Sequence, residues 1–266
     1  MMRAADDAAI RFDDGAAYEC FMGRWSRAAG VLFLDWLAPP TQARWLEIGC
    51  GSGAFTALIH ERCHPAAIVA LDPAPAQIAY ARRRMDANGI MFHVAAAEAL
   101  PCSDASQDIV VSALALNFIA DRPTALREMR RAARAGGIIA GYVWDFAGGR
   151  TPHAPLVVAL RRLGIDGPPP PGGVDCALAA LQSLFAGAGL AGIETAVLDI
   201  ETTYPDFAAF WSAQTPSFSP TSRLIARMTA AQRAGLFDTL RATLPVRPDG
   251  SIAYPARAHA VKARAP

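Results

Sequence analysis

The fold of this chain is decided by residues 45–53, which read WLEIGCGSG. An apolar run ends there in Gly49, Gly51 and Gly53, and residues 54–60 continue with apolar side chains at helical spacing. Glycine allows a sharp turn and lets a ligand approach the backbone, because it has no Cβ. Free N–H groups at the start of the following helix face the same ligand. The stretch therefore predicts a buried strand, a ligand-binding loop and a helix.

Glu47 bears on the choice of ligand. It lies two positions before Gly49, and an acid inside the loop suits a ligand that carries a positive charge. The same segment also fits the looser dinucleotide pattern G-x-G-x-x-A through Gly49, Gly51 and Ala54. Taken alone, the loop leaves open a nicotinamide or flavin cofactor and S-adenosylmethionine (SAM).

A second acid follows at the end of the apolar run at residues 67–72. Asp72 lies about 20 residues beyond the glycines, where an acid at the end of the second strand binds the ribose hydroxyls of a nucleoside. Pro73 and Pro75 then lead into a predicted helix over residues 76–88. The ligand is therefore expected to contain a nucleoside.

The alternation of apolar runs and helices continues along the chain. Further strands are predicted at residues 90–94, 108–112 and 138–145. A helix begun by Asp121 is predicted to run to residue 134 and to be ended by the Ala-Gly-Gly sequence at 135–137. Five such strands predict an α/β fold with a doubly wound parallel sheet, whose ligands bind beyond the carboxyl ends of the strands. Those ends hold residues 47–53, 72, 96–100, 112–117 and 144–145.

Five motifs occur in order between residues 41 and 145. They are EIGCGSG at 47–53, LDP at 71–73, AEALP at 97–101, QDIVVS at 107–112 and RAGG at 134–137. With them the chain resembles the class I SAM-dependent methyltransferases, most closely the small-molecule branch related to quinone-biosynthesis methyltransferases. FMGRWSR at 21–27 and YVWD at 142–145 resemble a bacterial subgroup of that family. The resemblance implies a seven-stranded, mostly parallel, Rossmann-like sheet with a helical lid, and SAM as the cofactor.

The resemblance also implies roles for the loop residues. Gly49, Gly51 and Gly53 would pack against the methionine portion and the ribose of SAM, with Cys50 among the cofactor-binding residues. Glu47 would contact the amino group of the cofactor.

The adenosine of SAM would be held by a second group of residues. Asp72 would bind both ribose hydroxyls, and the adenine would lie near Pro73, Gln77 and the backbone of Ala97 and Glu98. One position departs from the family pattern, because many relatives carry Asp where this chain has Ala96. The contact of that Asp with the adenine amino group is lost here or passes to Glu98.

The remaining cofactor contacts come from two separate segments. Ser112 and Leu114 would line the sulfonium side, and Tyr18 and Arg24 would close over the carboxylate of the cofactor. These four residues complete the expected cofactor site.

The rest of the chain is expected to complete the sheet and cover the site. Residues 1–40 are expected to form a helical cap, residues 41–203 and 246–266 the Rossmann-like core, and residues 204–245 a helical, aromatic lid. Residues 192–202 and 251–262 read as further strands, and a helix is predicted over residues 176–188.

The predicted reaction is methyl transfer to an O, N, C or S atom of a small apolar or aromatic metabolite or natural-product intermediate, mainly by positioning the reactants. A general base is needed only for an acceptor that keeps its proton at neutral pH, and the candidates are His153, Asp145 and Tyr142. Two alternatives remain open: a nicotinamide-dependent oxidoreductase, and a SAM-fold protein that binds the cofactor without methylating.

Composition agrees with an enzyme that acts on a small molecule. Hydrophobic residues make up 53% of the 266 residues and the net charge is +1, so no overall field attracts nucleic acid or an anionic membrane. Five scattered cysteines fit free thiols in a reducing cytosol, and Cys63-His64 is not a metal site by its spacing. A cytoplasmic monomer or homodimer is expected, without a signal peptide, because the first residues are polar. Solvated helix faces are expected for Arg82, Arg83, Arg84, Arg127, Arg130, Arg131 and Arg134.

Overall fold

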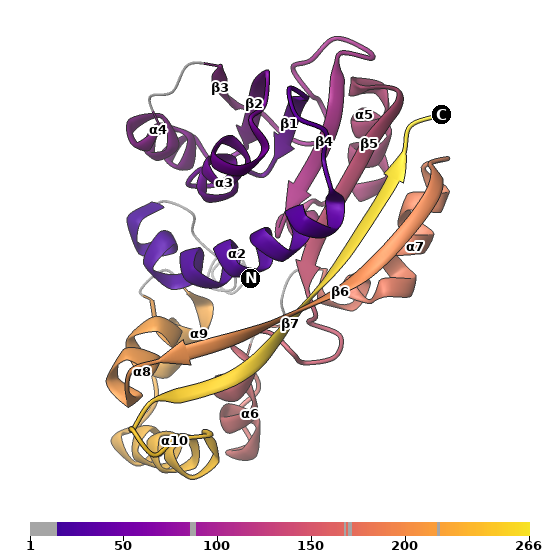
Figure 1. Ribbon diagram of the computed structural model, residues 1–266. Coiled ribbons are helices and arrows are strands. Elements are labelled where there is room, and N and C mark those ends of the chain that lie inside the picture. Colours follow the sequence, from indigo (N-terminus) through magenta and orange to yellow (C-terminus); the bar gives the residue numbers. More distant parts are fainter. Residues whose placement is uncertain (1–14, 86–88, 168, 170–171, 217–218) are drawn as a thin grey trace, which may run out of the picture.

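The computed structural model describes residues 15–85, 89–167, 169, 172–216 and 219–266. Its centre is a seven-stranded sheet in the order β3-β2-β1-β4-β5-β7-β6 (Figure 1). The first five strands are parallel, and β7 lies antiparallel between β5 and β6. This confirms the predicted α/β fold with a mostly parallel sheet. The strands are β1 (Arg44–Ile48), β2 (Ala67–Asp72), β3 (Ile90–Val94), β4 (Gln107–Ala113), β5 (Ala133–Trp144), β6 (Ala191–Tyr204) and β7 (Ile252–Arg264).

Helices cover both faces of the sheet, and the side chains of β1 show how. Successive side chains of a strand point to opposite faces, so Trp45 packs into one buried cluster and Leu46 into the other. The cluster around Trp45 belongs to α2 (Gly15–Leu37), α3 (Ala54–Cys63) and α4 (Pro75–Arg84). The cluster around Leu46 belongs to α5 (Arg122–Ala132) and α7 (Leu178–Gly187).

The order of the strands fixes where a ligand can bind. The chain runs outward from β1 through β2 to β3, and then returns to the other side of β1 with β4. The loops that follow β1 and β4 therefore diverge and leave a crevice beyond their carboxyl ends.

A helical region separates β6 from β7. Figure 1 shows it at the far end of the long β6–β7 pair, together with the helix that follows β5. Aromatic rings fill its interior, as in the contacts of Phe210 with Tyr204 and of Trp211 with Phe237. The prediction of a helical, aromatic segment after Tyr204 agrees with this structure. The helices are α6 (Ala154–Arg162), α8 (Phe207–Gln214), α9 (Pro220–Ala226) and α10 (Ala230–Thr243).

The glycine pair after α5 was interpreted wrongly as the end of a helix. The helix ends at Ala132, and β5 begins at the next residue. A Cβ on Gly137 would lie 2.8 Å from the carbonyl oxygen of Arg134 and 3.2 Å from that of Asp108. Glycine is therefore needed here because two backbone segments approach each other closely inside the sheet.

Other helices also differ from the predictions. Helix α4 ends at Arg84, and residues 86–88 of its predicted extension lie outside the described residues. The helix predicted over residues 176–188 divides into a short 3-10 helix, η2 (Gly173–Cys176), and α7. Helix α6 was not predicted. None of the helices in the described ranges is long and apolar enough to cross a bilayer.

Candidate functional site

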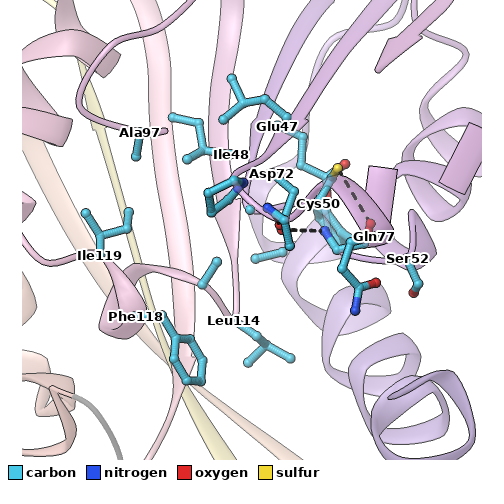
Figure 2. A pocket seen from close by; sticks show the side chains of 18 of the residues that line it. Glu47, Ile48, Cys50, Ser52, Asp72, Gln77, Ala97, Leu114, Phe118 and Ile119 are labelled. Carbon is cyan, nitrogen blue, oxygen red and sulfur yellow. Dashed lines mark hydrogen bonds between the residues drawn. The ribbon is translucent and has the colours of Figure 1, made fainter. Parts of the chain in front are cut away.

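A pocket of about 350 Å³ opens beyond the carboxyl ends of β1, β2 and β4. Its walls come from the loop after β1, the end of β2, residues 96–98 and residues 113–120. Figure 2 shows Phe118 and Ile119 on one side, with Asp72, Cys50 and Gln77 on the other. The pocket thus lies where the order of the strands requires a ligand site.

The three glycines of the loop have three different reasons to be glycine. Gly49 has φ +74°, and a Cβ on it would lie 2.3 Å from the Cβ of Ala115. Gly53 has φ +81° and approaches Ala81. Gly51 has φ +52°, and a Cβ on it would meet no atom within 4 Å, because this residue faces the pocket. A ligand can therefore lie directly against the backbone at Gly51.

Asp72 shapes the loop as well as lining the pocket. One carboxylate oxygen accepts a hydrogen bond from the backbone N–H of Gly51 at 3.0 Å, and the other accepts from that of Ala74 at 2.8 Å. Burial raises the pKa of Asp72, and these two hydrogen bonds oppose the rise. The carboxylate keeps lone pairs that can accept from a ligand hydroxyl group.

Glu47 is the most deeply buried acid of the pocket, with 1% of its surface exposed. The hydroxyl of Thr56 donates a hydrogen bond to its carboxylate at 2.6 Å. Burial raises the pKa of Glu47 to about 7, with a further rise from the charge of Asp72. A ligand cation placed here would favour the ionised form.

Gln77 brings an unsatisfied amide to the pocket wall. Its side chain is 1% exposed, and neither its oxygen nor its nitrogen has a hydrogen-bond partner among the described residues. A buried amide without partners is costly, because it has lost its hydrogen bonds to water. A ligand with hydroxyl or amine groups would satisfy it.

Residues 96–98 form the wall beside the end of β3. Ala96 is exposed and Ala97 is buried, and both line the pocket. The carboxylate of Glu98 accepts from the backbone N–H of Asp121 at 3.3 Å, which ties this loop to the start of α5. Glu98 also lines the pocket, so an acid is present near the position where Ala96 replaces the family's Asp.

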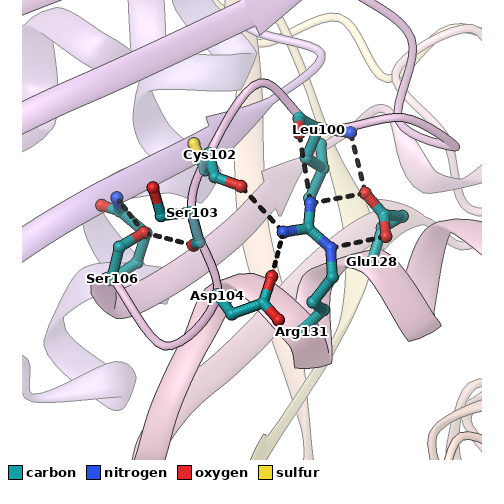
Figure 3. Close-up of polar contacts among 8 residues, drawn as sticks. Leu100, Cys102, Ser103, Asp104, Ser106, Glu128 and Arg131 are labelled. Atoms are coloured by element: carbon teal, nitrogen blue, oxygen red, sulfur yellow. Dashed lines mark hydrogen bonds and ion pairs between the residues drawn. The ribbon is translucent and has the colours of Figure 1, made fainter.

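Arg131 holds the chain that continues from this wall (Figure 3). Its guanidinium donates to the carbonyl oxygens of Leu100 at 3.1 Å and Cys102 at 2.8 Å, and it pairs with Asp104 at 2.7 Å. Glu128 binds the same guanidinium at 2.7 Å and accepts from the N–H of Leu100 at 2.9 Å. The expectation of a merely solvated side chain is therefore wrong for Arg131.

Two neighbouring arginines also have structural partners. Arg130 donates to the carbonyl oxygen of Ala188 at 3.1 Å, and Arg134 pairs with Asp108 at 2.5 Å. Both residues are exposed, as expected for a solvated face, and these contacts in addition tie them to the end of α7 and to β4.

The end of β4 contributes a strained residue to the site. Leu114 has φ +57°, in a region that branched side chains rarely adopt. Its N–H donates to the carbonyl oxygen of Tyr142 at 2.8 Å, and both residues line the pocket. Ser112 was expected beside Leu114 in the site, but it is fully buried in the sheet and lies outside this lining.

Two of the three candidate bases lie outside the pocket lining. His153 shares a hydrogen bond of 2.8 Å between its Nδ1 and the amide oxygen of Gln214, and its ring packs edge-on against Trp25. Burial lowers the pKa of His153 to about 4, although the Gln214 bond opposes this. Asp145 is 4% exposed and accepts from the N–H of Gly148 at 2.6 Å. Tyr142 alone of the three lines the pocket.

The N-terminal candidates cannot be placed at the site. Tyr18 and Arg24 belong to α2, but their side chains lie outside the described residues. Among the described side chains of α2, that of Ser26 lines the pocket, and the sequence did not indicate it.

Gln214 was also missed, although it organises the buried polar contacts beside His153. Its amide nitrogen lies 3.0 Å from the carbonyl oxygen of Pro152, 2.9 Å from the hydroxyl of Tyr204 and 3.1 Å from that of Tyr254. These residues are far apart in the sequence, so no local signal could have grouped them. The described residues also hold no cluster of His, Cys, Asp or Glu that could bind a metal ion.

Comparison with known proteins agrees with this geometry. Residues 46–141 match the family model described as a methyltransferase domain. This segment of the chain is a methyltransferase domain. This confirms the family resemblance that the five motifs indicated, and the match covers β1 to β5, from which most of the pocket is built.

Curated relatives of this methyltransferase domain have several different names, and two of them serve as examples. A malonyl-[acyl-carrier protein] O-methyltransferase from Methylococcus capsulatus is 34% identical over 50% of this chain and 47% of its own length. A demethylmenaquinone methyltransferase from Thermus thermophilus is 37% identical over 43% of this chain and 51% of its own length. The chain therefore spans about half the length of these relatives.

Solved structures share the fold over nearly the whole chain. The YcgJ protein from Bacillus subtilis has a TM-score of 0.58 at 18% identity, covering 89% of this chain and 97% of its own. The geranyl diphosphate C-methyltransferase from Streptomyces coelicolor A3(2), in complex with S-adenosylhomocysteine (SAH), has a TM-score of 0.51 at 14% identity, covering 90% and 79%. The common feature is the Rossmann-like methyltransferase fold.

Proposed function

We infer that this chain is a SAM-dependent methyltransferase that acts on a small apolar or aromatic molecule. The observation that carries this proposal is the arrangement of Glu47, the backbone at Gly51 and Asp72 around one pocket. These three features lie at the carboxyl ends of adjacent strands. Glu47 suits a cationic group, the backbone at Gly51 is open to a ligand, and Asp72 suits a ribose. All three lie inside the segment that matches a methyltransferase domain.

The residues present fit SAM. Asp72 would accept hydrogen bonds from the ribose hydroxyls, and Glu47 would pair with the amino group. The unsatisfied amide of Gln77 lies in the same wall and would hydrogen-bond the adenosine portion. The backbone of Ala97 and Glu98 would face the adenine, as the resemblance implies.

SAM, when bound, supplies a methyl group on a positively charged sulfur. It would offer its methyl carbon to a lone pair of the acceptor, with the electrons of the C–S bond returning to sulfur. The contribution of this chain is to hold both molecules in line and to limit water around them, because well-held reactants gain a large effective concentration.

The opposite wall of the pocket suits an apolar acceptor. Leu114, Phe118 and Ile119 line it, and Phe118 is 39% exposed. Tyr142 is the one candidate base in contact with the pocket, and would act only on an acceptor that retains its proton. The names of the relatives do not select among acceptors, since they include both a malonyl-carrier protein and demethylmenaquinone.

Ligand binding tests this proposal. The purified protein should be stabilised against heat by SAM and SAH and not by NAD or NADH, because ligands that bind the folded state raise its stability. Calorimetry should give an SAH affinity at least tenfold weaker for Asp72→Ala, with Asp121→Ala, an acid outside the pocket lining, as the matched control. Stabilisation by NADH, or by none of the four, would contradict the assignment. Tight SAH binding without methyl transfer to any acceptor would favour a non-methylating role.

A further inference from the structure

Thr56 is the one residue with a hydroxyl on the buried side of α3. The other buried residues of this helix are Phe55, Leu58, Ile59 and Cys63. Thr56 is 0% exposed. A buried hydroxyl costs free energy unless it has a hydrogen-bond partner, and a valine side chain of similar shape would avoid that cost. Threonine is therefore favoured here only through the group that its hydroxyl binds.

That group is the carboxylate of Glu47, and this contact differs from those of other helical threonines. In α10, the hydroxyls of Thr239 and Thr243 each donate to the carbonyl oxygen four residues earlier, both at 2.8 Å. Thr56 instead donates to Oε2 of Glu47 at 2.6 Å. Short hydrogen bonds of this kind are typical of an ionised acceptor. The hydroxyl thus joins the first turn of α3 to a charged group on β1.

The place of Glu47 in the sheet explains why it needs this partner. It lies in β1 between β2 and β4, opposite Ala70 and Val111, and it is 1% exposed. Burial raises its pKa to about 7, the hydroxyl of Thr56 opposes this rise, and the charge of Asp72 adds to it. Without the hydroxyl, the carboxylate would keep its proton to a higher pH and would lose the contact that fixes its orientation.

The same hydrogen bond leaves Glu47 able to bind a ligand. An ionised carboxylate has about four acceptor positions on its two oxygens. Glu47 lines the pocket, whereas Thr56 lies outside the lining. A ligand cation can therefore approach the carboxylate from the pocket while Thr56 holds it from α3.

We propose that Thr56 is a positioning residue for the cofactor: its hydroxyl orients and stabilises the Glu47 carboxylate that pairs with the amino group of SAM. This inference rests on the proposed function and deepens it, because it assigns recognition of one ligand group to a side chain outside the pocket lining. Loss of the hydroxyl should weaken ligands that carry the amino group and spare those that lack it.

The test uses the full chain and two ligands, SAH and an analogue of SAH in which hydrogen replaces the amino group. Calorimetry at about pH 7.5 should show that Thr56→Val weakens SAH by about fivefold or more, and the analogue by no more than about twofold. Thr56→Ser keeps the hydroxyl and should bind SAH within about twofold of the unmodified protein. Equal weakening of both ligands by Thr56→Val would overturn the inference, and so would an unchanged SAH affinity.

The pH dependence of SAH affinity gives a second readout that a structural role would not move. Among the described residues, the titratable groups that interact with Glu47 are the carboxylate of Asp72 and the thiol of Cys50, and both are the same in every variant. The affinity should fall as Glu47 takes up its proton, and the fall should begin at a higher pH in Thr56→Val than in Thr56→Ser or the unmodified protein. Coincident pH profiles would overturn the inference. Failure of SAH to bind the unmodified protein would instead contradict the proposed function.

Discussion

The two walls of the pocket are built in different ways. The wall from Glu47 to Gln77 comes from two short segments, residues 47–55 and 71–77, which are joined by hydrogen bonds such as that from the N–H of Gly51 to Asp72. The opposite wall, from Ala113 to Ala120, is apolar and depends on distant elements that pack around it. The first wall can therefore be predicted from sequence motifs, whereas the shape of the second wall depends on the packing of the whole fold.

Gly49→Ala should break the first wall most severely. The new methyl group would lie 2.3 Å from the Cβ of Ala115, on a backbone with φ +74°. We expect a loss of about 2–4 kcal/mol in the free energy of unfolding, from the clash and the strained backbone together. Denaturant unfolding would measure it.

Gly51→Ala is the matched control for this substitution. Its φ is also positive, but a Cβ there meets no atom within 4 Å. It should cost only about 1 kcal/mol in stability and should weaken SAH binding, because the methyl group enters the pocket. Equal destabilisation by the two substitutions would show that contact with Ala115 is unimportant.

Glu47 should make the stability of the ligand-free protein depend on pH. Its folded-state pKa of about 7 lies above the ordinary value of 4.5 for a glutamate, so the folded state holds the proton more tightly. Stability should therefore be greatest below pH 4.5 for this group, fall as the pH rises and level off above about pH 7, by on the order of 3 kcal/mol. The measurement is denaturant unfolding at successive pH values.

The Glu47→Gln variant supplies the comparison. It should lose this part of the pH dependence, while other groups that titrate contribute equally to both proteins. SAH affinity of the unmodified protein should also decline as the pH falls below about 7, because protonation removes the charge that pairs with the amino group. An identical pH profile in both proteins would contradict this role.

Gln214→Leu tests the contacts behind the second wall. It removes the partner of His153 and of the Tyr204 and Tyr254 hydroxyls in a buried setting. We expect a loss of about 2 kcal/mol in the free energy of unfolding, because buried polar groups are left unpaired. SAH affinity should change by less than about threefold, since none of these residues lines the pocket. A large loss of SAH affinity at unchanged stability would show instead that the two walls are coupled.

Arg131→Ala should give the smallest of these effects. Its contacts with Leu100 and Cys102 are partly exposed, so we expect a stability loss of about 1 kcal/mol. SAH should bind a few times more weakly, because the chain that continues from Ala97 is less well held. Arg127→Ala is the control, since Arg127 is exposed and donates to the hydroxyl of Thr124 one turn away in the same helix, and calorimetry would compare the two variants.

The sequence predicted what depends on short-range pattern. The alternation of apolar runs and helices predicted the sheet. The spacing of Gly49, Gly51 and Asp72 predicted one wall of the pocket. It failed where distant segments meet, as at Gly137, which was interpreted as a helix end because its close contact with Asp108 comes from another strand.

The same limit explains the errors in the site. Ser112 and Leu114 are separated by one residue, yet the positive φ of Leu114 turns the chain into the pocket while Ser112 stays in the sheet. His153 follows the fifth strand as a base would, but Gln214 holds it outside the pocket lining from a helix 61 residues away. Neither backbone strain nor such a partner leaves a local signal in the sequence.

The place of β7 between β5 and β6 has a consequence for the order in which the protein folds. β6 pairs with β7 in the described sheet, so it has no partner until the ribosome has made residues 252–264. During synthesis the first five strands can already associate. β6 stays unpaired while the helices after it are being made. Pairing of this kind closes late and exposes an edge that can aggregate. Completion of the sheet therefore depends on when the synthesis of β7 is finished.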